Sequence, residues 1–291
     1  FFLIPLIVIM LVQSAITIGT LMVRHTAKTL EEYSSGMMRR LVENRKVILQ
    51  NEMTQRWNSI LDEEPVMNGL LKEYLTKRQL TLQQLLQDNA ACQELLETFF
   101  PECLKTLQNN LASGVFLVLV DGDRTNASEF DGFFIRDSAP ESKSANGTDM
   151  LLEKGSKELS RNYNVPLDTC WTTRFHMMGQ SKRESDNFFY EPWRAGEENP
   201  DAGTGDLGYW SKPFVLEDNP NDSHEMITYS VPLRHEGRVY AVLGIEISTA
   251  YLYEFLPVPE LNSSHQGGYL LAYDDGTGNY SIYAGKGMLY G

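Results

Sequence analysis

The sequence has few of the residues that build redox, zinc or hydrolytic sites. It holds three cysteines in 291 residues and no CxxC pair, so neither a disulfide framework nor a cysteine zinc site is predicted. It also lacks GxSxG, HExxH and P-loop motifs, and its histidines are scattered over expected loops. We therefore predict no catalytic residue, no metal and no cofactor, and expect that this chain is not an enzyme. Cys92 and Cys103 either pair across the break expected at Pro101 or are buried free thiols.

Positive charge is scarce as well. The formal net charge is −14, with 25 Lys and Arg against 39 Asp and Glu. Because nothing supplies a basic face for phosphates, nucleic acid is excluded as a partner, and docking on anionic lipid is disfavoured. The acidic stretch 191–225 favours a solvated loop over a calcium site, since no DxDxDG spacing occurs in it.

Charge is absent from residues 1–23, and Arg24, His25 and Lys28 follow at once. A helix of this length spans about 35 Å, enough to cross a hydrocarbon core of about 30 Å. A signal peptide has a shorter apolar region, and a core helix is seldom apolar on every face. We expect a transmembrane helix at 1–23, with residues 24–291 extracytoplasmic and the chain at the cell membrane. The three basic residues alone favour the opposite orientation.

Residues 24–110 have a helical pattern and form the expected stalk. Apolar residues from Leu30 to Ile60 recur every three to five positions, and Pro65 is expected to end this helix. A second helical block follows from about Met67 to Asn110, with a break near Pro101. The stripe along 28–61 predicts a parallel homodimer or, equally, packing on the chain's own sheet.

After residue 110 the apolar period changes to that of strands. We expect an α+β fold with an antiparallel sheet of about five strands. The strands are predicted at Gly114–Val120, Phe130–Arg136, Tyr209–Val215, Glu225–Leu233 and Arg238–Ser248. A short helix is expected within 149–162, an irregular stretch over 164–187, and an aromatic-rich loop from Phe188. Val239, Ala241, Leu243, Ile245 and Ile247 are expected to share one face of the last strand.

A short helix near Leu252 and a PVPE linker come next. Gly268–Tyr273 and Tyr280–Tyr283 predict two paired strands, too few to finish a sheet before residue 291. We therefore expect a sensor unit at 111–256, a second unit that begins at 257–291, and more chain beyond it. Five N-x-S/T sequons are either glycan sites or chance: Asn126, Asn146, Asn221, Asn262 and Asn279.

The segment 188–248 carries the most specific pattern. It contains Pro192-Trp193, then WSKPF at 210–214, ITYSVP at 227–232 and GRVYAVLGIEIS at 237–248. This order resembles the double Cache sensor domains of bacterial transmembrane receptors, whose units are PAS-like. LLEKG at 151–155 and FIRD at 134–137 resemble the sensors attached to Firmicutes diguanylate cyclases.

The resemblance implies a small-molecule site in the first unit. Family members that bind amino acids hold the ligand carboxylate with an Arg and a Trp, and its ammonium with an Asp. Here the Trp is Trp193, whereas Glu191 stands at the Arg position and Glu246 at the Asp position. Arg194 and Phe214 replace two tyrosines. The set of predicted ligand-binding residues is Trp193, Arg194, Tyr209, Trp210, Phe214, Tyr229 and Glu246.

Each of these residues has a structural alternative. Trp193, Tyr209 and Trp210 equally suit caps on the sheet. Glu246 on a central strand needs a partner, which is either a ligand cation or an internal base such as Arg194 or Arg238. Arg194 suits a ligand carboxylate. An amine or an organic acid therefore fits the set, and so does a site without ligand.

The expected function is an extracytoplasmic sensing domain of a membrane-bound signalling protein. Its missing effector is expected to be a diguanylate cyclase, or else a histidine kinase or chemoreceptor. Alternative functions are a membrane-anchored binding or adhesion protein without effector, and an extracellular hydrolase that uses paired acids.

Overall fold

A computed structural model gives the structure of the chain. It describes residues 3–110, 112–120, 129–138, 149–179, 183–216, 224–254, 268–274 and 277–287. The chain divides into a unit at Phe1–Met53 and a unit at Thr54–Gly291. Four of the five sequons and the turn expected at 218–222 lie outside the described residues, while Asn279 is exposed.

Helices account for the first 110 residues. Their bounds are α1 Leu3–Arg78, α2 Leu82–Gln87 and α3 Asn89–Asn110. The prediction that Pro65 and Pro101 end helices is wrong, because each lies inside one. A proline removes one backbone hydrogen bond, but apolar residues before and after it are fully buried here: Ile60 and Met67 around Pro65, Phe100 and Cys103 around Pro101. Tertiary packing outweighs the local break.

The apolar stripe of α1 changes environment along the helix. Leu30, Tyr33 and Met37 are exposed, whereas Ile60 and Met67 are fully buried against the sheet. The intramolecular explanation of the stripe therefore holds for the part within the second unit. No helix among the described residues is long and apolar enough to cross a membrane, and the span predicted at 1–23 is not shown.

The second unit is built on a seven-stranded sheet in the order β5-β4-β3-β1-β9-β8-β7. The strands are β1 Gly114–Leu119, β3 Gly132–Asp137, β4 Met150–Lys154, β5 Leu167–Thr172, β7 Tyr209–Trp210, β8 Met226–His235 and β9 Arg238–Ser248. All neighbours are antiparallel except β4 and β5. The sheet is therefore mixed and larger than the five strands predicted.

The remaining elements are short. They are β2 Glu129–Phe130, α4 Lys157–Tyr163, β6 Phe175–His176, α5 Asn187–Glu198, α6 Thr249–Glu254, β10 Gly268–Asp274 and β11 Tyr280–Gly287, with single 3-10 turns at Glu184–Asp186 and Thr204–Leu207. The helix near Leu252 and the β10–β11 pair confirm the predictions.

One local prediction is confirmed and two are wrong. The short helix expected within 149–162 is α4, which follows strand β4 and begins after Ser156, whose side chain caps it by accepting from the Leu159 amide. The irregular stretch 164–187 contains β5 and β6. The aromatic-rich loop is helix α5.

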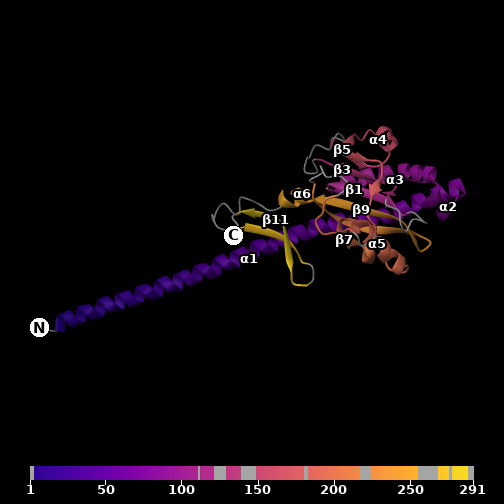
Figure 1. Cartoon of the computed structure of the whole chain (residues 1–291). Helices are drawn as coiled ribbons and strands as arrows, with labels where there is room; N and C mark the ends of the chain where they lie inside the picture. Colours follow the sequence, from indigo (N-terminus) through magenta and orange to yellow (C-terminus); the bar gives the residue numbers. More distant parts are fainter. Residues whose placement is uncertain are drawn as a thin grey trace. The chain divides into compact units, whose positions relative to one another are not determined.

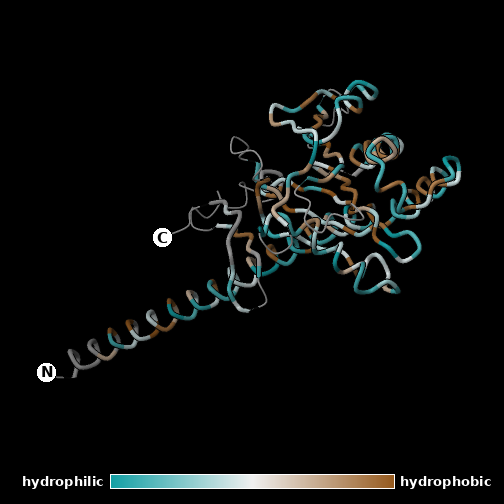
Figure 2. Tube along the Cα trace, turned by 45° about the vertical axis from the view of Figure 1, so that its right-hand side comes forward, coloured by the Kyte–Doolittle hydropathy of each residue, from teal (hydrophilic) through white to brown (hydrophobic). Residues whose placement is uncertain are grey.

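Helices cover both faces of the sheet (Figure 1). We call them the α1 face, covered by the C-terminal part of α1 and by α3, and the α5 face. Hydrophobic residues concentrate on the strands between these layers (Figure 2). Tyr240 on the α1 face donates to the Asn68 side chain at 3.0 Å, which joins β9 to α1.

The faces of β9 differ from the prediction at one residue. Ala241, Leu243 and Ile245 point to the α1 face as expected, but Val239 packs on the α5 face. The cause is an irregularity in the β8–β9 pairing, where Leu233 pairs with Ala241 and Arg234 with Val239. Tyr240 is the extra residue in β9, so Val239 before it points to the face opposite to the one that strict alternation predicts.

Candidate functional site

An aromatic cage lies between the sheet and α5. Helix α5 places Phe188 over the strands, where its ring stacks on Phe214 at 5.6 Å with an 8° interplanar angle. The same ring meets Phe116 of β1 edge-on at 5.0 Å. The cage lines a cavity of about 10 Å³, formed by Phe116, Phe134, Phe175, Phe188, Phe214, Leu216, Met226 and Thr228. That volume holds at most about one water molecule, so a ligand requires these side chains to move.

A buried carboxyl group lies at the polar end of this cage. Register places Thr228 of β8, Glu246 of β9 and Gly114 of β1 side by side. Glu246 is 0% exposed, and its Oε1 lies 2.6 Å from Nε2 of His224. Its Oε2 and the Thr228 hydroxyl have no hydrogen-bond partner among the described residues.

Gly114 leaves room for this carboxyl group. A Cβ atom at Gly114 would lie 2.4 Å from Glu246 Oε2 and 2.7 Å from the Phe134 ring. No side chain fits at this point, so the carboxylate lies against bare backbone beside an aromatic wall.

The arrangement suits a cation that donates hydrogen bonds. A buried carboxylate oxygen without a donor is costly. An ammonium group could donate to the carboxylate and to the Thr228 hydroxyl, and the aromatic faces would favour its charge. In chemical terms the arrangement suits an organic cation better than an acid.

Positive charge is present farther along the same face. Arg136 of β3 pairs with Gly114 on the side opposite to Glu246, and its Nη1 lies 3.0 Å from Glu153 Oε2. Glu153 and its neighbour Lys154 are fully buried. The α5 face thus holds acids and bases within one layer of aromatic packing.

The structure divides the predicted site residues between the two faces. Phe214 lines the cage, and Glu246 lies at its polar end. Trp193 packs on α5, stacked on Tyr190 at 6.0 Å, but it does not line the cavity. Burial raises the pKa of Tyr190 to about 12, with Asp186 as the next cause.

Two predicted residues lie on the opposite face. Tyr229 packs between Trp210 at 4.9 Å and Trp57 of α1 at 5.6 Å, between ring centroids. All three belong to the α1-face core. Tyr209 pairs with Ser230 on β8, at the edge of the sheet. These positions fit the structural alternative for Trp210, and they place Tyr229, predicted only as a ligand contact, in the same core.

The expected internal partners of Glu246 are not the ones observed. Arg194 forms an ion pair with Glu191 on α5, and its side chain is 43% exposed. Arg238 begins β9, eight positions before Glu246 and at the far end of the strand. The partner is His224, because the β8–β9 register brings the residues before Met226 beside the end of β9.

Sequence reasoning missed His224, Thr228, Gly114 and the cage residues Phe116 and Phe134. The only available signal was the glycine at the start of a β-rich run. His224 follows an acidic turn and has no marked context.

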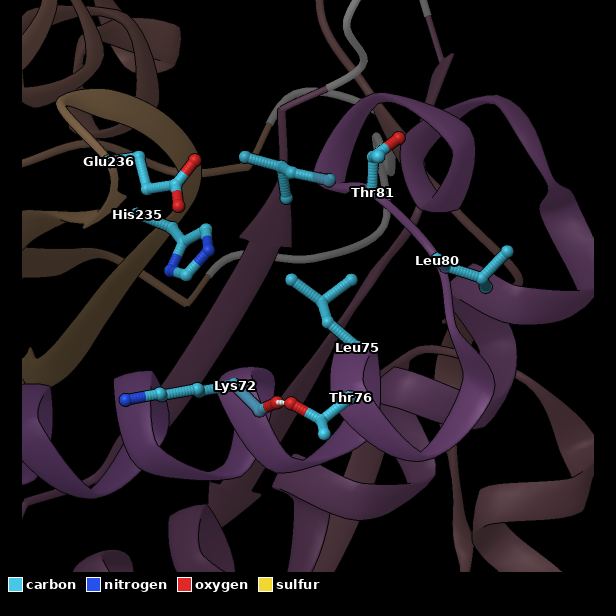
Figure 3. Close-up of a pocket in the computed structure, with 8 residues that line it drawn as sticks. Lys72, Leu75, Thr76, Leu80, Thr81, His235 and Glu236 are labelled. Atoms are coloured by element: carbon cyan, nitrogen blue, oxygen red, sulfur yellow. Dashed lines mark hydrogen bonds between the residues drawn. The ribbon is translucent and has the colours of Figure 1, made fainter.

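A second cavity of about 360 Å³ opens at the turn between β8 and β9 (Figure 3). His235 and Glu236 of that turn lie across it from Lys72 of α1, with Leu75 between them. Thr76 on the same helix donates its hydroxyl to the Lys72 carbonyl at 2.7 Å. This cavity is bordered by exposed polar side chains, and no buried polar atom without a partner lines it among the described residues.

Metal binding has no support in the described chain. No group of three or more His, Cys, Asp or Glu side chains there could hold an ion. Cys92 and Cys103 are buried and form no disulfide with each other. Burial raises the pKa of the Cys103 thiol well above its usual value.

No protein-family model and no curated protein matches the chain. Similar solved structures are bacterial sensory domains. The periplasmic sensory domain of the Campylobacter jejuni chemoreceptor Tlp1 is 13% identical with a TM-score of 0.35, over 77% of this chain and 66% of that one. "Methyl-accepting Chemotaxis protein X" is 15% identical with a TM-score of 0.36, over 78% and 71%.

The ligand-binding domain of the Pseudomonas aeruginosa PAO1 amino acid chemoreceptor PctC, in complex with GABA, is a third. It is 14% identical with a TM-score of 0.29, over 82% of this chain and 75% of that one. The chain spans about two thirds of the Tlp1 domain. TM-scores this low do not establish a common fold.

Proposed function

We propose that the chain is the extracytoplasmic small-molecule-sensing part of a membrane-bound signalling protein of the Cache type. The observation that carries the proposal is the buried carboxyl group of Glu246 beside an aromatic cage, with one oxygen that has no hydrogen-bond partner in the described part of the chain. The order of motifs at 188–248 supports the same conclusion. The ligand is a small organic cation, and an amine is the simplest such group.

The proposed site lies between the sheet and a helix that could move. Phe188 and Phe189 of α5 are buried in the cage layer, and the closed cavity of about 10 Å³ must open for a ligand. Ligand binding would then favour an open arrangement of α5, since a ligand shifts an equilibrium only through differential affinity for two states.

The output of this change lies in chain beyond residue 291. The proposed effector is a diguanylate cyclase, with a histidine kinase or a chemoreceptor signalling domain as the other choices. The proposed membrane span is residues 1–23, and the exposed apolar residues Leu30, Tyr33 and Met37 support a homodimer contact along α1.

A thermal-shift screen of the full chain in detergent tests the proposal. Primary amines, quaternary amines, amino acids and carboxylic acids are compared at equal ionic strength. An amine at 100 times its dissociation constant stabilises the folded state by about 2.7 kcal/mol. Carboxylic acids are expected to have no effect.

Two variants locate the effect. Glu246→Gln is expected to abolish the amine response, because it removes the negative charge. Trp193→Ala on α5 is the control. Because Trp193 does not line the cavity, this variant is expected to retain most of the amine response. If no amine raises the melting temperature of the wild-type chain, the sensor proposal fails.

A further inference from the structure

His224 holds the position that a ligand cation needs. Its Nε2 lies 2.6 Å from Glu246 Oε1, and its side chain is 22% exposed while that of Glu246 is 0% exposed. The imidazole therefore separates the buried carboxyl group from solvent. An imidazole can carry a positive charge and donate a hydrogen bond, so it has the chemistry of a small organic cation.

We propose that His224 is a built-in occupant of the cation site, and that the ligand binds by displacing it from Glu246. The proposal rests on the proposed function for the nature of the ligand, but the contact itself does not. The argument for displacement is that His224 already contacts Glu246 at 2.6 Å. The neighbouring cavity, which Thr228 lines, has a volume of about 10 Å³ and is too small to offer a ligand another place.

Two described residues, Gly114 and Phe134, lie against Oε2. Gly114 backbone lies behind Oε2, where even a Cβ atom would be 2.4 Å away. Phe134 of β3 reaches the same point, since its ring would lie 2.7 Å from that Cβ. The His224 imidazole is the partly exposed group that contacts Glu246. A ligand that reaches Glu246 from solvent therefore requires the imidazole to move away.

Displacement of His224 is coupled to the opening of the cage. His224 precedes β8 by two residues, and Met226 at the start of β8 forms a reciprocal backbone pair with Phe214, both N–H···O distances being 2.9 Å. Phe214 is the cage residue that stacks on Phe188 of α5. A change at His224 therefore reaches the α5 helix through a short, continuous set of contacts.

Few other charges face this contact among the described residues. β1 presents Gly114, β8 presents Thr228 after the exposed Glu225, and the charge in the neighbouring position on β3 is Arg136.

Rescue by free imidazole tests the proposal without knowledge of the natural ligand. His224→Ala in the full chain leaves an imidazole-sized space beside Glu246. Added imidazole is expected to raise the melting temperature of this variant by about 3–6 °C at about ten times its dissociation constant. The wild-type chain and His235→Ala, which changes a histidine at the β8–β9 turn, are expected to show no such rise.

The double variant His224→Ala/Glu246→Gln separates charge from volume. It has the same space but no carboxylate, so imidazole rescue is expected to be lost. If imidazole fails to stabilise His224→Ala, or stabilises all variants equally, the proposal is overturned. If His224→Ala does not fold, His224→Gln replaces it, since the amide keeps a hydrogen-bond donor at this position. Methylammonium binding by His224→Gln then tests the proposal.

Methylammonium binding, measured by calorimetry, gives that second readout. The wild-type chain is expected to bind methylammonium more weakly than His224→Gln, because this variant lacks the imidazole that competes for Glu246. Equal binding by the two chains contradicts the proposal. Imidazole rescue without any amine binding would support the role of His224 and reject the proposed amine-sensing function. Amine binding that is unchanged in both His224 variants would support amine sensing and reject the role of His224.

Discussion

The α1 face and the α5 face of the sheet differ in what they bury. The α1 face is covered by aliphatic and aromatic residues such as Leu71, Phe100 and Leu243. The α5 face combines a phenylalanine cage with the fully buried Glu246, whose Oε2 has no hydrogen-bond partner among the described residues. The α1 face also buries a hydroxyl without such a partner, that of Tyr229, so the contrast lies in the fully buried carboxyl group. Since burial of a carboxyl group is more costly than burial of a hydroxyl, we expect the α1 face to contribute more to stability and the α5 face to carry the proposed ligand site.

Phe100→Ala should produce the largest effect and tests the stabilising role of the α1 face. Phe100 is fully buried and contacts the rings of Phe133 at 5.1 Å and Tyr163 at 4.8 Å. We expect the free energy of unfolding to fall by about 3–5 kcal/mol in urea titrations. Phe214→Ala, a partly buried cage residue, should cost less. Equal losses would contradict the division between the faces.

Tyr229→Phe should stabilise the α1 face. The Tyr229 hydroxyl is buried without a hydrogen-bond partner among the described residues, so its removal is expected to raise the free energy of unfolding by about 1 kcal/mol at pH 7.

The same variant has a pH signature. Burial raises the pKa of Tyr229 to about 12, with Asp206 as a further cause. The stability linked to this raised pKa is present below pH 10 and is lost as pH rises toward 12. Tyr229→Phe should lose less stability over that range than the wild-type chain. Tyr190→Phe on the α5 face, where the pKa is also about 12, is the matched comparison by urea titration at pH 7, 10 and 11.

Glu246→Gln should change stability by no more than about 1 kcal/mol, because the amide keeps a polar partner for His224 and removes a buried charge. Glu153→Gln is the control on the same face. Glu153 accepts from Arg136 at 3.0 Å, and its neutralisation leaves buried cationic neighbours, at a cost of about 3–5 kcal/mol. If Glu246→Gln costs as much in urea titration, Glu246 belongs to the structural framework.

Thiol reactivity gives the smallest effect and compares core with surface. Cys92 and Cys103 are buried, Cys170 is partly exposed, and none of the three forms a disulfide. Burial raises the pKa of Cys103, which disfavours the reactive thiolate. We expect iodoacetamide to modify Cys170 first in the native chain, as resolved by peptide mass spectrometry, and all three in urea. Early modification of Cys103 would show that the α3 core opens readily.

Much of the fold follows from local pattern. The runs that contain β1, β3, β8 and β9 have strand composition, and the β10–β11 pair was predicted from its turn residues. Helix ends were wrongly predicted at Pro65 and Pro101. The burial of neighbours such as Ile60 and Phe100 stabilises each helix by more than the lost backbone hydrogen bond destabilises it. The helix α5 was missed because Pro192 and Gly196 lie inside it, and its aromatic face is stabilised only by the sheet.

The site was predictable only in part. Glu246 and Phe214 come from the motif at 188–248, and both lie at the cage. Trp210 and Tyr229 come from the same motif but point to the other face, because adjacent strand residues alternate. His224 and Gly114 are 22 and 132 positions from Glu246 in the sequence, and no local pattern joins them.

The sequence by itself determined that the runs containing β1, β3, β8 and β9 are strands and that an acid stands on a central one. Only the tertiary structure decided what that acid meets. Strand pairing sets Glu246 between Thr228 and Gly114 and under His224, and one irregularity at Tyr240 decides which face Val239 joins. Register is a property of two strands together, so the residues of one strand do not specify it.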